Sequence, residues 1–327
     1  MSCSAKILVA TAFDGNWRWL ERHFEEDSYI WTFHRKDLLH LGRKALVRHA
    51  MQAAWRARQH DVIVTHGPWL TLFTAFFLKI FMVRRPHLAF TFNHGNGIFF
   101  EGLMLRLARW VLPTVDYFVT HSTYECALLS EKYGIPIERM QFTHWAVDYP
   151  DQHAAILGDE PYVCCIGRNN RDFPSFIEAL EQTGVKGVIV CRKSDADFQD
   201  LPDNVTVYSD LSLQECQALT QHALASVIPL IDDSTGAGHM TIVMSLLYGT
   251  PVIVTDSAVV SDYAIAEKTA LLVPRGDPDA LANSILLLKE SICMQVNLRR
   301  SCLEFANENL TETAAAAFLR KMLQRAL

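Results

Sequence analysis

The sequence predicts an α/β protein built from two doubly wound, Rossmann-like parallel-sheet domains that face each other across a cleft. Short apolar runs rich in β-branched and aromatic residues recur along the chain, and longer amphipathic stretches separate most of them. This alternation is typical of parallel sheets covered by helices on both faces. Eleven such runs are too many for one sheet of this kind without a break. The polar, non-periodic segment 147–160 is the predicted break.

The predicted strands fall into two groups along the chain. The first group comprises residues 6–10, 29–33, 61–65, 88–92 and 117–121. The second group comprises residues 162–167, 187–191, 204–208, 225–229, 251–255 and 270–274. We therefore expect an N-terminal domain over 1–150 and a C-terminal domain over 151–310. Residues 311–327 form a predicted helix, with Thr311 or Thr313 as its N-cap. One arrangement that we consider is that this helix packs back on the N-terminal domain.

Composition and charge are those of a folded globular chain rather than of a nucleic-acid binder. The 327 residues are 50% hydrophobic and 20% charged, with a net charge of −6. Residues 1–150 carry 17 Lys and Arg against 13 Asp and Glu, whereas residues 151–327 carry 13 against 23. The eight cysteines show neither a CxxC pair nor a Cys/His ligand spacing, and the N-terminus lacks the pattern of a signal peptide. These features favour a cytoplasmic protein with reduced thiols, no bound metal and no nucleic-acid partner.

One apolar segment, 69–85, allows two interpretations. It reads WLTLFTAFFLKIFMVRR, is shorter than the roughly 20 apolar residues of a spanning helix, and is interrupted by Lys79. In the first interpretation it is a buried helix that covers the first sheet. In the second it lies on a membrane surface, where Lys79, Arg84 and Arg85 meet anionic head groups.

The segment 232–257, DDSTGAGHMTIVMSLLYGTPVIVTDS, predicts an anion site. A strand ends near Pro229, and a loop of small residues leads into a helix from His239. Because glycines admit close approach to the backbone and a helix N-terminus offers unpaired N–H groups, this junction is suited to a phosphate. The alternative is a flexible loop whose glycines serve only its turns.

A second cluster of candidates follows the first strand of the second domain, in GRNNRDF. Gly167 ends the strand, and Arg168 and Arg171 follow it. Guanidinium groups donate a planar fork of N–H groups, so two arginines at a strand's carboxyl end can clamp a diphosphate. The alternative is that both are surface charges that pair with Asp172 and Glu178.

Taken in order, these motifs resemble the glycosyltransferases of the GT-B fold, in particular the retaining family 4 type. The segments GRNNRDF, VIPLIDDSTGAGHMTIVMSLLYGTPVIVTD and TALLVPRGDPDALANSI are similar to the donor-binding half across roughly 160–290. The first half is similar more loosely, through DVIVTHGPW, FTFNHG and VDYFVTHSTYECALL. The resemblance implies that 1–150 is the acceptor-side domain and that 151–310 is the nucleotide-sugar-binding domain.

The resemblance implies roles for individual residues. His94, in FTFNHG, matches a histidine that faces the transferred sugar, and Arg168 and Arg171 match the basic residues that hold the donor diphosphate. We assign these three as catalytic. The resemblance places the following residues at the donor: Gly167, Asp233, Thr235, Gly236, Ala237, Gly238, His239, Met240, Thr241, and Asp14, Gly15 and Asn16 of the loop after the first strand.

The sequence departs from the family pattern at two acidic positions. The family commonly has two Glu spaced eight apart around the glycine-rich loop. The second, which holds the nucleotide ribose, maps to Met244, and the first maps near Thr235 or Gly236. A methionine cannot accept a hydrogen bond from a ribose hydroxyl, so donor binding must be weaker, absent, or dependent on other groups. Asp232 and Asp233 lie just upstream as candidate replacements.

The resemblance thus implies a metal-independent retaining glycosyltransferase. A nucleotide-diphosphate sugar is the expected co-substrate, with a UDP-sugar favoured over a GDP-sugar, and no further cofactor is expected. The expected acceptor is a glycan or lipid-linked saccharide at the cytoplasmic membrane face, with 69–85 as a membrane contact. The alternatives are a catalytically inactive subunit that binds a partner protein or nucleotide, and a nucleotide-sugar epimerase.

Overall fold

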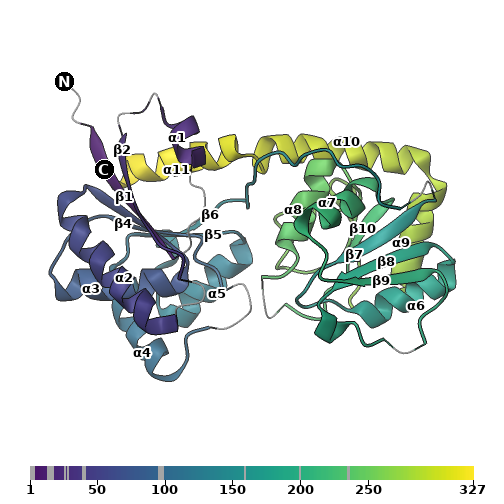
Figure 1. The fold of residues 1–327 in the computed structure, drawn as a ribbon, viewed down its shortest axis with the longest axis horizontal. Coiled ribbons are helices and arrows are strands. Elements are labelled where there is room, and N and C mark those ends of the chain that lie inside the picture. The colour runs from purple at the N-terminus through teal and green to yellow at the C-terminus, as the bar shows by residue number, and fades with distance from the viewer. Residues whose placement is uncertain are drawn as a thin grey trace. The chain divides into compact units, whose positions relative to one another are not determined.

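The structure is a computed structural model of the chain, and it describes residues 4–12, 18–25, 27, 29–38, 42–94, 99–157, 160–198, 200–233 and 236–327. Two compact units make up the chain. Unit 1 comprises Met1–Thr143 and Glu312–Leu327, and unit 2 comprises His144–Thr311. Each unit is a parallel sheet with helices on both faces (Figure 1).

The sheet of unit 1 has the order β2-β1-β3-β4-β5-β6, and every pairing is parallel. Its strands are β1 (Ala5–Thr11), β2 (Tyr29–Arg35), β3 (Val62–His66), β4 (His87–Phe90), β5 (Tyr117–Thr120) and β6 (Met140–Phe142). Strands β1, β3, β4 and β5 are almost wholly buried, as expected for parallel strands covered on both faces.

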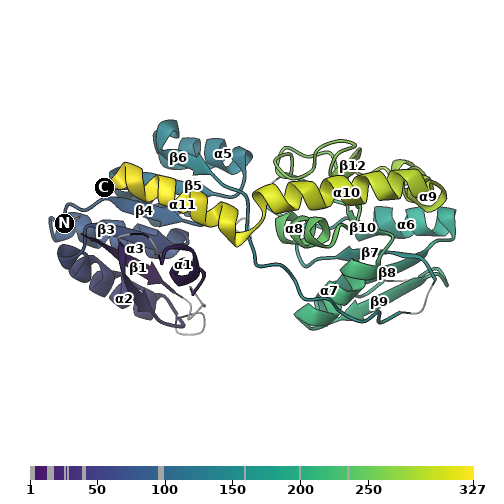
Figure 2. The same cartoon turned by 90° about the horizontal axis from the view of Figure 1, so that it is seen from above.

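The helices of unit 1 divide between the two faces of its sheet. They are α1 (Arg18–His23), α2 (Gly42–Arg56), α3 (Pro68–Ile80), α4 (Gly102–Val111), α5 (Thr123–Tyr133) and α11 (Glu312–Ala326), with 3₁₀ turns at Ala57–Gln59, Leu112–Thr114 and Ile137–Arg139. Side chains of α2 and α3 pack on the face that carries Leu8 and Ile63. The C-terminal α11, yellow in Figure 2, packs with Ile7 and Val9 on the other face.

The sheet of unit 2 has the order β12-β11-β10-β7-β8-β9, also wholly parallel. Its strands are β7 (Tyr162–Ile166), β8 (Lys186–Cys191), β9 (Val205–Ser209), β10 (Ala225–Ile228), β11 (Val252–Thr255) and β12 (Ala270–Val273). Numbered within the unit, this is the doubly wound order 3-2-1-4-5-6 of dinucleotide-binding folds.

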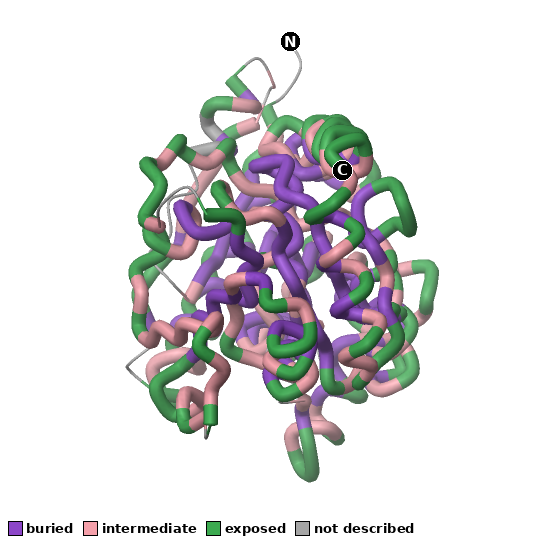
Figure 3. The backbone as a smooth tube through the Cα atoms, turned by 90° about the vertical axis from the view of Figure 1, so that its right-hand side faces the viewer, coloured by how far each residue is buried: buried purple, intermediate pink, exposed green. Residues whose placement is uncertain are grey.

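The helices of unit 2 are α6 (Phe173–Thr183), α7 (Leu213–His222), α8 (His239–Tyr248), α9 (Pro278–Glu290) and α10 (Ile292–Asn309), with a 3₁₀ turn at Lys193–Asp195. Helices α6 and α9 pack on one face of the sheet, and Leu219 of α7 packs on the other with Tyr162 and Val188. In both units the buried backbone, purple in Figure 3, runs through the interior, and exposed residues lie at loops and outer helix surfaces.

All eleven predicted strands are present, and the predicted fold class is confirmed. The sequence reading missed β6 (Met140–Phe142) because three residues are too few to show a period of two. This strand is nevertheless paired along its length with β5.

The segment that joins the units begins as part of unit 2. The His144 ring nitrogen Nε2 donates to the Asp262 carbonyl at 3.0 Å, and the Trp145 N–H donates to the Tyr263 hydroxyl at 2.8 Å. Further along, the Tyr248 hydroxyl donates to the Asp151 carbonyl at 3.1 Å. The segment 147–160 is therefore not only a spacer between domains, because the backbone of Asp151 and of His153 also bonds to side chains of unit 2.

Of the two interpretations of 69–85, burial holds for the first part of the segment. Residues 70–75 and Leu78 of α3 are buried, and Leu72 packs under Phe92 and Phe118. The exposed part starts at Lys79 and Ile80 and continues through Met82, Arg84 and Arg85. Among the described residues, no helix combines the length and the apolar character that crossing a membrane requires.

Candidate functional site

The predicted phosphate loops lie at the place where a doubly wound sheet binds ligands. Strand β7 is the first strand of unit 2, and it has β8 on one side and β10 on the other. The chain therefore leaves the carboxyl ends of β7 and β10 toward opposite faces, which opens a crevice between the two loops. The loop after β7 contains Gly167, Arg168 and Arg171, and the loop after β10 leads to Gly236 and Gly238.

These two loops are joined by hydrogen bonds. The Asn170 side chain donates to the Asp232 carbonyl at 2.7 Å and accepts from the Asp232 N–H at 3.2 Å. The Asp172 N–H donates to the Pro229 carbonyl at 3.0 Å. Because Asn170 bonds through both ends of its amide, the two loops hold one relative position.

Helix α8 presents its N-terminus at this junction. Gly238 is its N-cap in a left-handed conformation, with φ of 96°, which glycine adopts without strain. No described side chain caps the helix, so its first N–H groups keep their donor capacity. Ala237 and Gly238 have the smallest side chains, and the helix dipole adds positive potential. The arrangement is suited to an anion.

Arg168 and Arg171 differ in burial, although nothing in the sequence distinguishes them. Arg168 is exposed and, among the described residues, makes no hydrogen bond or ion pair. Arg171 is only 7% exposed. Its guanidinium donates to the Asn169 carbonyl at 2.9 Å and to the Thr241 hydroxyl at 3.2 Å. Neither Asp172 nor Glu178 pairs with it; Asp172 instead caps α6.

The Arg171 cation is buried directly beneath Gly167. A Cβ atom added at Gly167 would lie 2.5 Å from Arg171 Nε. Burial lowers the pKa of this guanidinium, and the neighbouring Cys165 raises it. Because the ordinary pKa of arginine is so high, the group stays charged. Its Nε has no hydrogen-bond partner among the described residues. Arg171 thus supports the loop from behind, whereas Arg168 is exposed. That the two arginines hold a diphosphate together stays a prediction.

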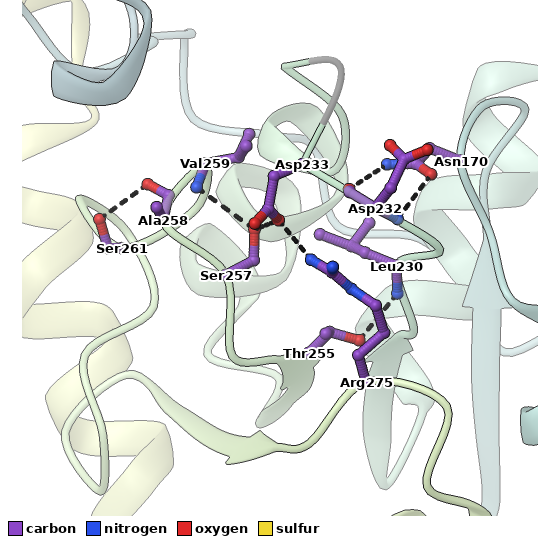
Figure 4. A network of polar contacts seen from close by, with 10 residues as sticks. All are labelled: Asn170, Leu230, Asp232, Asp233, Thr255, Ser257, Ala258, Val259, Ser261 and Arg275. Carbon is purple, nitrogen blue, oxygen red and sulfur yellow. Dashed lines mark hydrogen bonds and ion pairs between the residues drawn. The ribbon is translucent and has the colours of Figure 1, made fainter. Parts of the chain in front are cut away.

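The carboxyl ends of β10, β11 and β12 are linked through Asp233 (Figure 4). Its Oδ1 accepts from the Ser257 hydroxyl at 2.6 Å and from Arg275 Nη2 at 2.6 Å. The Leu230 N–H donates to the Thr255 hydroxyl at 2.8 Å in the same network. Asp233 is therefore already engaged within the sheet edge.

The two methionines of α8 share one face of the helix. Met240 is 43% exposed and Met244, four residues later, is half-buried. His239 points inward instead, where its Nε2 donates to the Val259 carbonyl at 2.8 Å and its ring lies 5.0 Å from that of Tyr263. Burial lowers the His239 pKa, and hydrogen bonding to the backbone of Val259 and Gly236 opposes that shift.

In unit 1, His94 lies just past the end of β4 in an aromatic cluster. It is 5% exposed, and its Nε2 is 2.9 Å from the Tyr133 hydroxyl. That hydroxyl also accepts from the Phe100 N–H at 3.2 Å. The rings of Phe92, Phe99 and Phe100 surround the imidazole at 5.0–6.0 Å. Tyr133 was not among the predicted residues, and no local sequence signal connects it with His94.

Other predictions fall outside the described residues. These are Asp14, Gly15, Asn16 and Thr235. Within the described part of the chain, no group of three or more His, Cys, Asp or Glu side chains is placed to hold a metal ion. The described cysteines are free thiols.

Comparison with known families accounts for both units. Residues 160–291 match the family described as "Glycosyl transferases group 1", and residues 15–149 match "Glycosyltransferase Family 4". The chain belongs to the family 4-type glycosyltransferases. It is therefore a glycosyltransferase, and its doubly wound units are the two halves of a GT-B fold.

Solved structures with the same fold extend over nearly the whole enzyme. HepE from Anabaena, in complex with UDP, has a TM-score of 0.74 and 13% identity, with 98% of this chain and 100% of that chain covered. The complex of HepE with UDP-glucose has a TM-score of 0.72 and 14% identity, again with 98% of this chain and 100% of that chain covered. Sucrose-phosphate synthase from Thermosynechococcus elongatus has a TM-score of 0.71 and 15% identity, with 98% of each chain covered. No curated protein sequence matches this glycosyltransferase.

Proposed function

We propose that this glycosyltransferase moves a sugar, with retention and without a metal ion, from a UDP-sugar to a glycan or lipid-linked saccharide. The observation that carries the proposal is the N-terminus of α8 at the β7–β10 junction, which no described side chain caps, with the exposed Arg168 on the neighbouring loop. UDP and UDP-glucose are bound in the HepE structures, which supports a donor whose leaving group is UDP.

The chemistry requires stabilisation of a diphosphate that gains negative charge as the sugar leaves. In our proposal the N–H groups of Gly238, His239 and Met240 and the Arg168 guanidinium donate to the departing phosphate, as preorganised donors aimed where charge develops. The buried Arg171 cation raises the positive potential beneath them. The departing phosphate accepts the acceptor's proton, so no carboxylate base is required. His94 of unit 1 is assigned to the sugar.

The test is thermal unfolding of the purified enzyme in EDTA against UDP, GDP, ADP and TDP, with Arg168→Ala and the matched exposed control Arg300→Ala. UDP at about 100 times its dissociation constant adds roughly 2.7 kcal/mol of stability. We expect this shift for wild type and Arg300→Ala, and its loss in Arg168→Ala. Removal of one such donor also costs roughly 10²–10³ in transfer rate.

Two outcomes would redirect the proposal. A shift that requires Mg²⁺ would refute metal independence, and no shift with any nucleotide would favour the alternative of a catalytically inactive subunit. Met244 is the observation behind that alternative, because it removes the acidic group that the family uses for the ribose. Retention is checked separately, from the anomeric configuration of the product by NMR.

A further inference from the structure

Unit 1 carries a continuous exposed surface of aromatic, apolar and basic side chains that its fold does not require. The apolar members are unusually exposed: Trp55 by 57%, Ile80 by 52%, Met82 by 86% and Trp110 by 51%. They come from the last turn of α2, the end of α3 and the turn after it, and the last turn of α4. We call this surface the aromatic–basic face: Trp55, Arg58, Lys79, Ile80, Phe81, Met82, Arg84, Arg85 and Trp110.

Ring contacts connect these residues into one surface. The Trp55 ring lies 5.7 Å from that of Phe81, and Phe81 lies 5.7 Å from Phe77. Phe77 contacts Phe76 at 5.2 Å, and Phe76 reaches Trp110 at 6.3 Å. The exposed tryptophans at the two ends thus belong to a single aromatic row, rather than to separate surface positions.

Cations are held against this row. The Arg58 guanidinium lies 3.6 Å from the centre of the Trp55 ring, and Lys79 Nζ lies 4.4 Å from that of Trp110. Arg84 and Arg85 are exposed beside Met82 and, with Lys79, line a hollow of about 610 Å³. Asp116, which also lines the hollow, accepts from the His87 N–H at 2.8 Å.

The segment that supplies most of the face is predominantly positive. Residues 42–111, which contain α2, α3 and α4, carry ten Lys and Arg against two acids, Asp61 and Glu101. Asp61 accepts from the Lys6 N–H at 2.8 Å. The enzyme as a whole has a net charge of −6. A surface where positive charge concentrates around exposed tryptophans is complementary to an anionic bilayer, whose interface favours Trp and attracts Lys and Arg.

We propose that the aromatic–basic face docks unit 1 on an anionic lipid bilayer. Trp55, Ile80, Met82 and Trp110 enter the interfacial layer, and Lys79, Arg84 and Arg85 bind lipid phosphates. The contact is the end of α3 with its neighbours, not the length of 69–85, because most of α3 is buried. The inference rests on the proposed function in one respect, that docking would bring the enzyme to a lipid-linked acceptor.

Met82 offers a clean perturbation of this face. It has φ of 54°, a left-handed conformation that asparagine tolerates better than methionine, and its side chain is 86% exposed. Met82→Asn therefore removes apolar surface without straining the fold. Arg84→Gln with Arg85→Gln removes two charges. The matched controls lie on α10 of unit 2: Ile292→Asn, which replaces a side chain that is 73% exposed, and Arg299→Gln with Arg300→Gln, another exposed adjacent pair.

The experiment is co-flotation of the full-length enzyme with vesicles of phosphatidylcholine alone or with phosphatidylglycerol added. Wild type and both controls should float with the anionic vesicles only. At roughly a factor of five per cation, Arg84→Gln with Arg85→Gln should bind about 30-fold more weakly, and Met82→Asn should also bind more weakly. Equal binding of the Arg84/Arg85 variant and its control, no binding by wild type, or a dimer that the face variants abolish would overturn the proposal.

UDP stabilisation measured on the same preparations separates this inference from the proposed function. Vesicle binding without UDP stabilisation would leave docking intact and count against donor binding. UDP stabilisation without vesicle binding would refute docking alone. The face variants should retain the full UDP shift, since none of the changed residues lies in the donor loops of unit 2.

Discussion

The contact between Gly167 and Arg171 allows a quantitative test of how the donor loop is built. A Cβ at residue 167 would lie 2.5 Å from Arg171 Nε, 2.7 Å from Cζ and 2.8 Å from Nη2. The guanidinium cannot simply move aside, because the Asn169 carbonyl and the Thr241 hydroxyl hold it. Gly167→Ala should therefore destabilise unit 2 by about 1–3 kcal/mol, the usual cost of overpacking a buried site.

The same substitution should change sign when the arginine is absent. In an Arg171→Ala background the clash disappears, and Gly167→Ala should then be neutral or stabilising by about 0.4–1 kcal/mol, since alanine restricts the unfolded chain. Arg171→Ala alone should cost about 2–3 kcal/mol, because it removes charge-assisted hydrogen bonds worth about 1.5–3 kcal/mol each but also relieves the desolvation of a buried cation. The expected coupling energy between the two sites is about 2 kcal/mol, within the range for contacting residues.

The assay is a double-mutant cycle read by urea unfolding, with hydrogen exchange in β7 and β8 to assign the transition to unit 2. A cost of Gly167→Ala that is equal in both backgrounds would refute the steric argument. If Gly167→Ala left stability unchanged but abolished UDP binding, Gly167 would be required for the approach of the ligand and not for the packing of Arg171.

Two further predictions concern a buried acid and the ribose position. Burial raises the pKa of Glu125 from 4.5 to about 7; because the folded state holds this proton more tightly, the contribution of Glu125 to the stability of unit 1 should fall as the pH rises from 4.5 to 7, by roughly 1.4 kcal/mol per pH unit. Glu125→Gln should remove that slope in unfolding midpoints recorded across this window, and an unchanged slope would contradict the assignment. Because Met244 cannot accept from a ribose hydroxyl, UDP and 2′-deoxy-UDP should bind with affinities within about threefold, whereas Met244→Glu should favour UDP by roughly 1 kcal/mol or more. Isothermal titration with both nucleotides checks this, and a strong preference of the wild type for UDP would show that another group holds the ribose.

The fold class could be predicted from the sequence because a parallel strand that is buried on both faces consists of consecutive apolar residues. Cys164 and Cys165 in β7, for example, point to opposite faces and are both fully buried. Strand β6 lacks this signal: its three residues form a strand only because β5 provides a free edge. The short element depends on tertiary pairing, which local sequence does not encode.

The sequence predicted which loops form the candidate site, but not how the side chains of those loops are placed. Glycines and a helix start mark the α8 junction in the sequence, and parallel strands bring the loops after β7 and β10 together. Arg168 and Arg171 are equally basic in the sequence, but the structure buries Arg171 and exposes Arg168. The turn at Asn170, with φ of 54°, separates them, and the Asn170 amide bonds to Asp232 from the other loop. The turn that places the two arginines differently is thus held by a residue from a distant strand end.

The burial of Arg171 also bears on why an acidic residue at position 244 can be absent. A buried cation without a carboxylate partner is tolerated only where carbonyl and hydroxyl oxygens solvate it, as those of Asn169 and Thr241 do here. Its uncompensated charge lies beneath a loop that would bind a diphosphate, and Coulomb attraction between buried charges is strong. In the proposed site this charge would attract the donor diphosphate, and the α8 face of Met240 and Met244 would offer apolar contact. Such a site would hold the diphosphate firmly and discriminate weakly among riboses.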